Sequence, residues 1–246
     1  MGGRVRYLLL QTRNAGDPMA AQEVRCFARA LGCDPGAIEV FDLLNGAPTR
    51  ELLSEFDILL LGGSGHYSAA CKPGSETPPW LARTLDCLRE IHESARPTFA
   101  SCWGFQAMAR ALGGECINDQ PNAEIGTIEL TLTAAGRGDP VFGSLPAAFS
   151  AQAGHEDHVV ALPNEAVLLA ASALVPQQAF CVAGKPIYCT QFHPELDRAA
   201  MLERAAAYPE YVQRIAGISY EQFALRVRET PESNLLLRQF VDHVLK

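Results

Sequence analysis

A cysteine stands where a buried strand pattern changes into a helical one. Thr98–Ser101 is typical of a strand, and the residues after Cys102 are typical of a helix, so Cys102 lies at a sharp strand-to-helix turn. Such a turn projects its central side chain above the sheet and needs small residues two positions before and after it, which Ala100 and Gly104 provide. The start of a helix also favours negative charge, which stabilises a thiolate. Cys102 is therefore a candidate nucleophile, although most free cysteines are buried and inert.

A histidine and a glutamate follow a second strand pattern late in the chain. The run Ile187–Phe192 leads directly into His193, Pro194 and Glu195. Residues i and i+2 of an extended backbone point to the same side, so Glu195 is expected to accept the ring N–H of His193. The other ring nitrogen is then free to take a proton from a cysteine. A lone histidine is more often structural, so the pairing with Cys102 is what supports a catalytic hypothesis.

Strands and helices alternate along the chain before Cys102. Strands are predicted over Arg4–Gln11, Ile38–Leu43 and Asp57–Leu61, and helices over Met19–Leu31 and Pro79–Glu93. This alternation is typical of a parallel sheet. The candidate residues must therefore be positioned by the carboxyl ends of neighbouring strands, where sites in such sheets lie.

Beyond Gly114 the pattern changes to short strands separated by turns. They are predicted over Thr127–Thr133, Phe149–Gln152, Val167–Ser172, Ala179–Val182 and Pro186–Phe192. From Asp197 the pattern is helical again, which predicts surface helices that close the fold. We expect one domain over residues 1–246, with a core over about 4–196 and a C-terminal helical extension over about 197–246.

Composition and charge exclude several classes of protein. The 246 residues include 28 acidic side chains against 20 lysines and arginines, and the resulting charge of −8 argues against a nucleic-acid surface. Apolar stretches such as Tyr7–Leu10 are too short to span a bilayer, and the N-terminus lacks a signal-peptide pattern, so no membrane contact and a cytoplasmic location are expected. The eight cysteines include no CxxC pair, so no metal site is expected.

The chain contains the motifs Cys102-Trp103-Gly104-Phe105-Gln106 and Phe192-His193-Pro194-Glu195. Both resemble signatures of the class I (triad) glutamine amidotransferase family. The segment Asp139-Pro140-Val141-Phe142 with Leu145-Pro146 is similar to one found in the GMP-synthetase-like branch of that family. The resemblance covers roughly residues 50–200. It implies that Cys102 is the nucleophile, His193 the base and acid, and Glu195 the residue that orients the histidine.

A glycine-rich loop after the strand Asp57–Leu61 resembles the oxyanion loop of that family. The resemblance implies that the N–H groups of Gly63 and Trp103 stabilise the oxyanion, and losing one such donor typically costs about 3 kcal/mol. A dinucleotide-binding turn is disfavoured, because Ser68 stands where the third glycine is needed and no helix begins there. A glycine turn without function is the remaining alternative.

Three further residues are candidates for substrate contact. The resemblance implies that Gln106 hydrogen-bonds the bound glutamine. His155 and Asp157 belong to a segment similar to the His-x-Asp-x-Val segment of the family. For these two residues substrate contact and a structural turn network both stay open.

The resemblance implies the fold and the reaction. The fold is an α/β, three-layer, flavodoxin-like sandwich with a mostly parallel central sheet, antiparallel additions and C-terminal helices. The reaction is hydrolysis of the γ-amide of glutamine through a γ-glutamyl thioester on Cys102, without a cofactor, and the implied partner is a separate ammonia-accepting synthetase. A free-standing hydrolase or peptidase of γ-glutamyl conjugates is the alternative, and a catalytically silent binding module is a third hypothesis.

Overall fold

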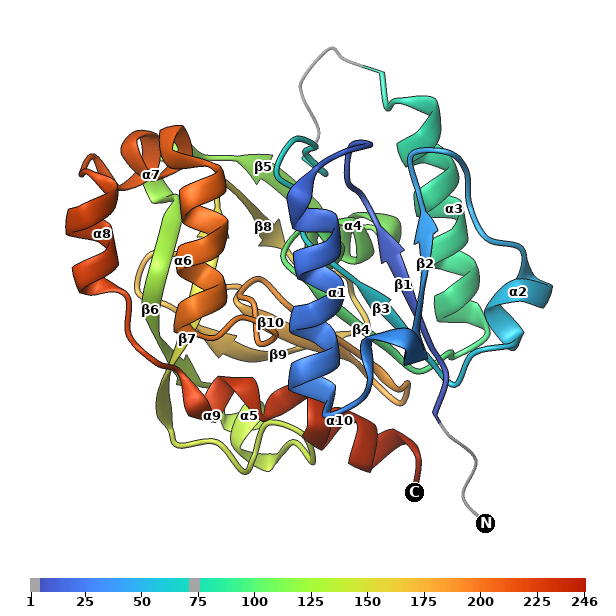
Figure 1. Ribbon diagram of the computed structural model, residues 1–246. Coiled ribbons are helices and arrows are strands. Elements are labelled where there is room, and N and C mark those ends of the chain that lie inside the picture. The colour runs from blue at the N-terminus through green and yellow to red at the C-terminus, as the bar shows by residue number, and fades with distance from the viewer. Residues whose placement is uncertain (1–4, 71–75) are drawn as a thin grey trace.

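A nine-stranded sheet lies at the centre of the computed structural model, which describes residues 5–70 and 76–246 (Figure 1). Its parallel part runs in the order β2 (Ile38–Asp42), β1 (Tyr7–Gln11), β3 (Ile58–Leu61), β4 (Thr98–Ser101) and β11 (Ile187–Thr190). Antiparallel strands continue it as β10 (Ala179–Val182), β9 (Ala166–Ala171), β6 (Glu124–Leu132) and β7 (Ala148–His155). A parallel core with antiparallel additions is therefore confirmed.

Helices cover both faces of the sheet, because side chains of the central strands alternate between two apolar layers. Leu8 and Leu10 of β1 point into one layer, and Tyr7 and Leu9 point into the other. The first layer is covered by α3 (Pro79–Glu93) and α4 (Trp103–Ala111), and the second by α1 (Pro18–Leu31) and α10 (Leu236–Val244). The predicted three-layer arrangement is confirmed.

The C-terminal segment is docked against the start of the chain. It forms α6 (Arg198–Ala207), α7 (Pro209–Ala216), α8 (Tyr220–Arg226) and α9 (Pro231–Asn234) before α10. Met201, Val212 and Phe223 pack with Cys26 of α1 in a third apolar cluster. Figure 1 accordingly shows α6 beside α1, with α7 and α8 next to β6. This docking brings α6 and α7 to the carboxyl ends of the parallel strands.

Several short elements differ from the sequence predictions. β5 (Glu115–Asn118) and β8 (Asp157–Ala161) form a separate antiparallel pair that the sequence does not predict, because each strand buries too few apolar side chains to show a period. The other unpredicted elements are α2 (Arg50–Ser54), α5 (Ala134–Gly138) and 3-10 turns at Pro35–Ala37 and Gln120–Asn122. α10 is packed more deeply than a surface helix, since Leu236, Leu237 and Phe240 are fully buried.

We predict that Gly104→Ala destabilises the protein, although alanine favours a helix interior over glycine by about 1 kcal/mol. A Cβ at Gly104 of α4 would lie 2.5 Å from the Cβ of Leu61, so β3 and α4 would have to move apart. Overpacking of this kind costs about 1–3 kcal/mol. Urea denaturation measures the effect. The matched control is Gly46→Ala, where an added Cβ meets open space. Equal stability of the two variants would contradict the close approach at Gly104.

Candidate active site

Cys102 occupies a strained turn between β4 and α4. Its backbone has φ 52° and ψ −105°, a region that costs a residue other than glycine about 1–3 kcal/mol. Two backbone hydrogen bonds hold the turn: the Cys102 N–H donates to Thr190 O at 2.8 Å, and the Gly104 N–H donates to Gly62 O at 3.1 Å. The turn is thereby fixed to the ends of β11 and β3.

The loop after β11 is held from two sides. The His193 N–H donates to Gln152 O on β7 at 2.8 Å. The side-chain nitrogen of Asn234, at the end of α9, donates to the carbonyl oxygens of Pro194 and Leu196, each at 2.8 Å. His193 is therefore positioned by the sheet and by a C-terminal helix together.

The predicted histidine–glutamate pair forms as expected. Nδ1 of His193 lies 2.6 Å from Oε1 of Glu195, and both side chains are buried. Burial alone would lower the pKa of His193, but Glu195 and the sulfur of Cys102 raise it to about 9. Burial alone would raise the pKa of Glu195, but His193 and the Arg204 guanidinium lower it. The site therefore stabilises an imidazolium beside a carboxylate.

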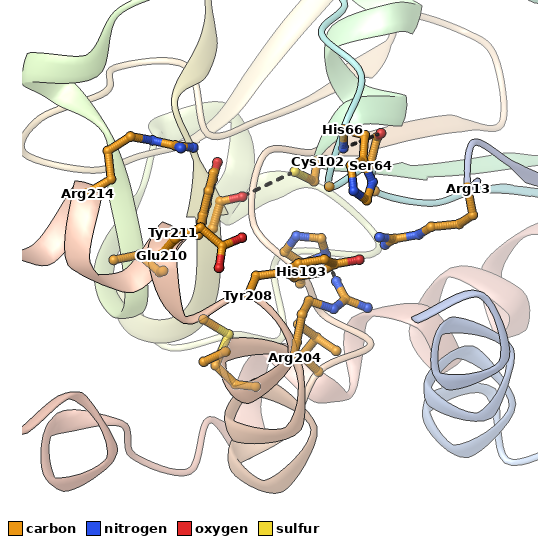
Figure 2. Close-up of a pocket in the computed structure, with 17 residues that line it drawn as sticks. Arg13, Ser64, His66, Cys102, His193, Arg204, Tyr208, Glu210, Tyr211 and Arg214 are labelled. Atoms are coloured by element: carbon orange, nitrogen blue, oxygen red, sulfur yellow. Dashed lines mark hydrogen bonds between the residues drawn. The ribbon is translucent and has the colours of Figure 1, made fainter. Parts of the chain in front are cut away.

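Two cavities meet at Cys102. The polar cavity, of about 200 Å³, is bounded by Tyr67, Ser68, Gln106, Asn118, His155 and Asp157. The α6–α7 cavity, of about 150 Å³, is bounded by Ile125, His193, Leu196, Met201, Ala205 and Tyr208. Figure 2 shows the second cavity, with Cys102 and His193 facing it and a hydrogen bond of 3.7 Å from the Cys102 sulfur to Gly154 O. The sulfur therefore has access to both spaces.

Gly63 lies beside the site, but its N–H has a partner in this structure. The N–H donates to Oε1 of Glu23 at 3.0 Å, and Glu23 in turn accepts from Arg13 and Gln11. A Cβ at Gly63 would lie 2.9 Å from Cε1 of His193, so the loop passes directly against the histidine ring. Gly63 therefore lies where the prediction puts it, but its N–H is bonded to a carboxylate, and its role as an oxyanion donor stays a prediction. The Trp103 N–H, the first of α4, has no acceptor within its own helix.

The three candidate substrate residues have different environments. Gln106 donates through its side-chain nitrogen to Asp157 O at 2.8 Å and to Gln191 Oε1 at 3.2 Å. The His155 ring lies 3.2 Å from Glu124 in a buried network. The Asp157 carboxylate accepts from Ser68 and Asn118. All three candidates border the polar cavity, and each one also serves a structural network.

The sequence does not predict the site residues that come from α6, from α7 and from the junction between them. Arg204 places a guanidinium nitrogen 3.5 Å from Nδ1 of His193, and Tyr208 and Tyr211 line the α6–α7 cavity (Figure 2). The only sequence signal for them is their spacing of four and three residues, which is typical of one helix face and equally typical of core packing. Arg13 and Glu23 are not predicted either, although the buried ion pair between them supports the Gly63 loop.

A cysteine at this turn, a buried His–Glu pair and a sheet of this topology agree with the family that the sequence matches. The family described as glutamine amidotransferase class-I matches residues 38–202, and the chain belongs to this family. It is similar to a glutamine-hydrolysing GMP synthase subunit of Methanothermobacter thermautotrophicus, with 31% identity over 62% of this chain and 73% of the relative. It is also similar to γ-glutamyl peptidase 4 of Arabidopsis thaliana, with 24% identity over 89% of this chain and 84% of the relative. A solved glutamine amidotransferase from Thermotoga maritima has the same fold, with 21% identity, a TM-score of 0.79 and full coverage of both chains.

Residues 5–70 and 76–246 offer neither a metal cluster nor a membrane-spanning helix. Within these ranges, no three His, Cys, Asp or Glu side chains are grouped to hold a metal ion. None of the helices in the same ranges has the length and apolar character needed to span a bilayer.

We predict that Glu195→Gln lowers both the stability of the protein and the pKa of His193. The raised pKa of His193 contributes stability that is complete below 6.5 and is lost as the pH rises through about 9. The lowered pKa of Glu195 contributes stability that is present above 4.5 and is lost as the pH falls. The stability deficit of the variant should therefore be largest between pH 4.5 and 6.5, at roughly 3–5 kcal/mol.

Urea denaturation at several pH values measures this deficit, and NMR titration of the histidines measures the pKa. Ser150→Ala is the control. It removes an exposed hydrogen bond to Glu129, and its effect on stability should not vary with pH in this way. A deficit that does not vary with pH would contradict the charged pairing of His193 with Glu195.

Proposed function

We propose that this protein hydrolyses γ-glutamyl amides through a covalent thioester on Cys102. The observation that carries the proposal is the position of the sulfur: it lies on a strained turn at the start of α4, between a polar cavity and a buried His193–Glu195 pair. A nucleophile on a sharp turn, a base and a carboxylate that orients the base are the parts that nucleophilic acyl transfer requires.

The first half of the reaction forms the thioester. The proton of the Cys102 thiol passes to Nε2 of His193, the nitrogen that is not bonded to Glu195, and the sulfur attacks the γ-carbonyl carbon. The carbonyl oxygen becomes an oxyanion, which the Trp103 N–H stabilises, and the Gly63 N–H joins it when its bond to Glu23 opens. The C–N bond then breaks, and the leaving nitrogen takes the proton from His193.

The second half releases glutamate. Water gives a proton to Nε2 of His193 as its oxygen attacks the thioester carbon, and the C–S bond breaks as the proton returns to the sulfur. Because the nitrogen of Gln106 already has two acceptors, its side-chain oxygen is the atom left to accept from the α-ammonium group of the glutamyl half. Asp157 supplies a carboxylate in the same cavity.

Two substrates fit this chemistry. Glutamine, with ammonia passed to a separate synthetase, is supported by the likeness to the GMP synthase subunit. A γ-glutamyl conjugate, hydrolysed without a partner, is supported by the likeness to γ-glutamyl peptidase 4, which spans more of this chain than the GMP synthase match does. Hydrolysis of a γ-glutamyl amide is common to both.

We predict that Cys102→Ala abolishes hydrolysis of γ-glutamyl amides and keeps the fold, because no other atom replaces the sulfur and the substitution removes only the sulfur atom. Circular dichroism checks the fold, and mass spectrometry locates the adduct of a diazo-ketone glutamine analogue in the wild-type protein. Cys116→Ala, at a buried cysteine away from both cavities, is the matched control. Modification at a cysteine other than Cys102 would contradict the assignment.

We predict that Glu195→Gln slows turnover less than His193→Ala. The amide can still accept from Nδ1 of His193, but it stabilises the imidazolium poorly, whereas His193→Ala removes proton transfer itself. General acid–base catalysis typically contributes about 10²–10⁴-fold, so His193→Ala should lose at least that much in kcat. Steady-state rates measured at the pH optimum of each variant test the order. Equal loss in both variants would give Glu195 a direct chemical role.

A further inference from the structure

We propose that the α6–α7 cavity binds the amine half of the substrate, and that the substrates are γ-glutamyl amides of amines with an apolar substituent. This inference rests on the proposed function, because it assigns the two halves of a γ-glutamyl amide to the two cavities that meet at Cys102. It specifies a leaving group larger than ammonia.

The direction of the substrate follows from the position of the acid. His193 must give its proton to the leaving nitrogen, and it borders only the α6–α7 cavity. Gln106, which serves the glutamyl half, borders only the polar cavity. The two oxyanion donors lie on either side of the junction, because Trp103 borders only the polar cavity and Gly63 only the α6–α7 cavity. With the reacting carbon at Cys102, the glutamyl half fills the polar cavity and the amine points between α6 and α7.

The size of the cavity argues against ammonia as its only occupant. A water-sized molecule such as ammonia needs about 10–15 Å³ of such space. The α6–α7 cavity offers about 150 Å³, which is enough for a substituent of several carbon atoms. A leaving group the size of ammonia would leave most of it unfilled.

The lining of the cavity selects an apolar substituent. Ile125, Leu196, Met201 and Ala205 supply apolar surface, three of them almost fully buried. The arginines that also border it already have partners: Arg13 pairs with Glu23, Arg204 donates to Gln22, and Arg214 pairs with Glu156. Glu210 is a further charged group in the lining, so the wall combines this apolar surface with charged side chains. Burying an alkyl group against the apolar part of the wall is favourable.

The cavity is preformed by fixed aromatic contacts. The Tyr208 hydroxyl donates to the Asp17 carboxylate at 2.9 Å, and a Cβ on Gly65 would lie 3.1 Å from the Tyr208 ring. The His66 ring packs edge-on against Tyr208. These contacts join the glycine-rich loop to the end of α6, so the wall is in place before a substrate binds.

A homologous series of substrates tests the inference. The purified full chain is assayed with glutamine and with γ-glutamyl methylamide, propylamide and butylamide, and the glutamate formed is measured in every case. The alkylamines have similar basicity, so differences in rate report contacts and not leaving-group reactivity. We expect kcat/KM to rise at least about 10-fold from the methylamide to the butylamide. The butylamide adds three methylenes, and a single well-buried methylene in an apolar pocket typically contributes about 10-fold or more.

Variants of α6 show whether the cavity causes this preference. Ala205→Leu fills the cavity and should lower the butylamide-to-methylamide ratio of kcat/KM at least about 10-fold. Ala206→Leu makes the same change at the neighbouring exposed position and should keep the wild-type ratio. Met201→Ala enlarges the cavity and should shift the optimum to longer alkyl chains, which provides a second test if Ala205→Leu does not fold.

The outcomes separate this inference from the proposed function. Rapid glutamine turnover with a flat or falling alkylamide series, or equal effects of Ala205→Leu and Ala206→Leu, would overturn the amine assignment alone. That result would favour the cavity as an exit for ammonia. No glutamate from any substrate, together with no labelling of Cys102 by the diazo-ketone, would overturn the proposed function and this inference with it.

Discussion

The strained turn at Cys102 is the constraint on which the site depends. Its positive φ persists because the surrounding backbone holds it from both sides, through hydrogen bonds to the ends of β11 and β3. The same strands pair with β4 in register, so Leu61 and Cys189 both lie opposite Ala100. The glycine loop after β3 and the histidine loop after β11 therefore come to the sulfur as a consequence of strand pairing. Further contacts then fix each loop: Asn234 holds the histidine loop, and Glu23 holds the glycine loop.

The second constraint is electrostatic and links the C-terminal helices to the sheet. A buried carboxylate is costly, and its pairing with an imidazolium offsets that cost only where other groups also satisfy it. Here Glu195 is completely buried and its Oε2 accepts no hydrogen bond from the described residues, so the second positive charge of the nearby Arg204 guanidinium on α6 matters for its charge. Gln22 of α1 accepts from Arg204 and so holds it in place. α6 therefore helps to set the charge state of the pair in addition to covering it.

The sequence predicts the parts of this site whose chemistry depends on residue type and local geometry. Cys102 at a strand end and His193 two residues before Glu195 meet both conditions, and the alternation of strands and helices gives the three layers. Arg204 and Tyr208 do not meet them, because their place depends on how α6 docks against α1, which is set by buried contacts from distant segments such as Cys26 with Met201. β5 and β8 stay unpredicted for the same reason, since their pairing and not their residue pattern makes them strands. The bond between Gly63 and Glu23 joins residues 40 positions apart and has no sequence signal.

That bond affects how substrate binding energy would be used if the Gly63 N–H acts as the proposed oxyanion donor. A hydrogen bond to a charged group typically contributes about 1.5–3 kcal/mol, and an oxyanion donor contributes about 3 kcal/mol in the transition state. The two contributions nearly cancel. Moving the Gly63 N–H from Glu23 to an oxyanion therefore stabilises the transition state little, unless the substrate supplies further binding energy at the same time. Glu23 keeps Arg13 and Gln11 as partners when Gly63 leaves, which limits the cost on the protein side. A substrate that fills both cavities contacts the loop from two sides, because Ser64 and Gly65 border both spaces. Contacts remote from the reacting carbon can in this way contribute to the chemical step and not only to affinity.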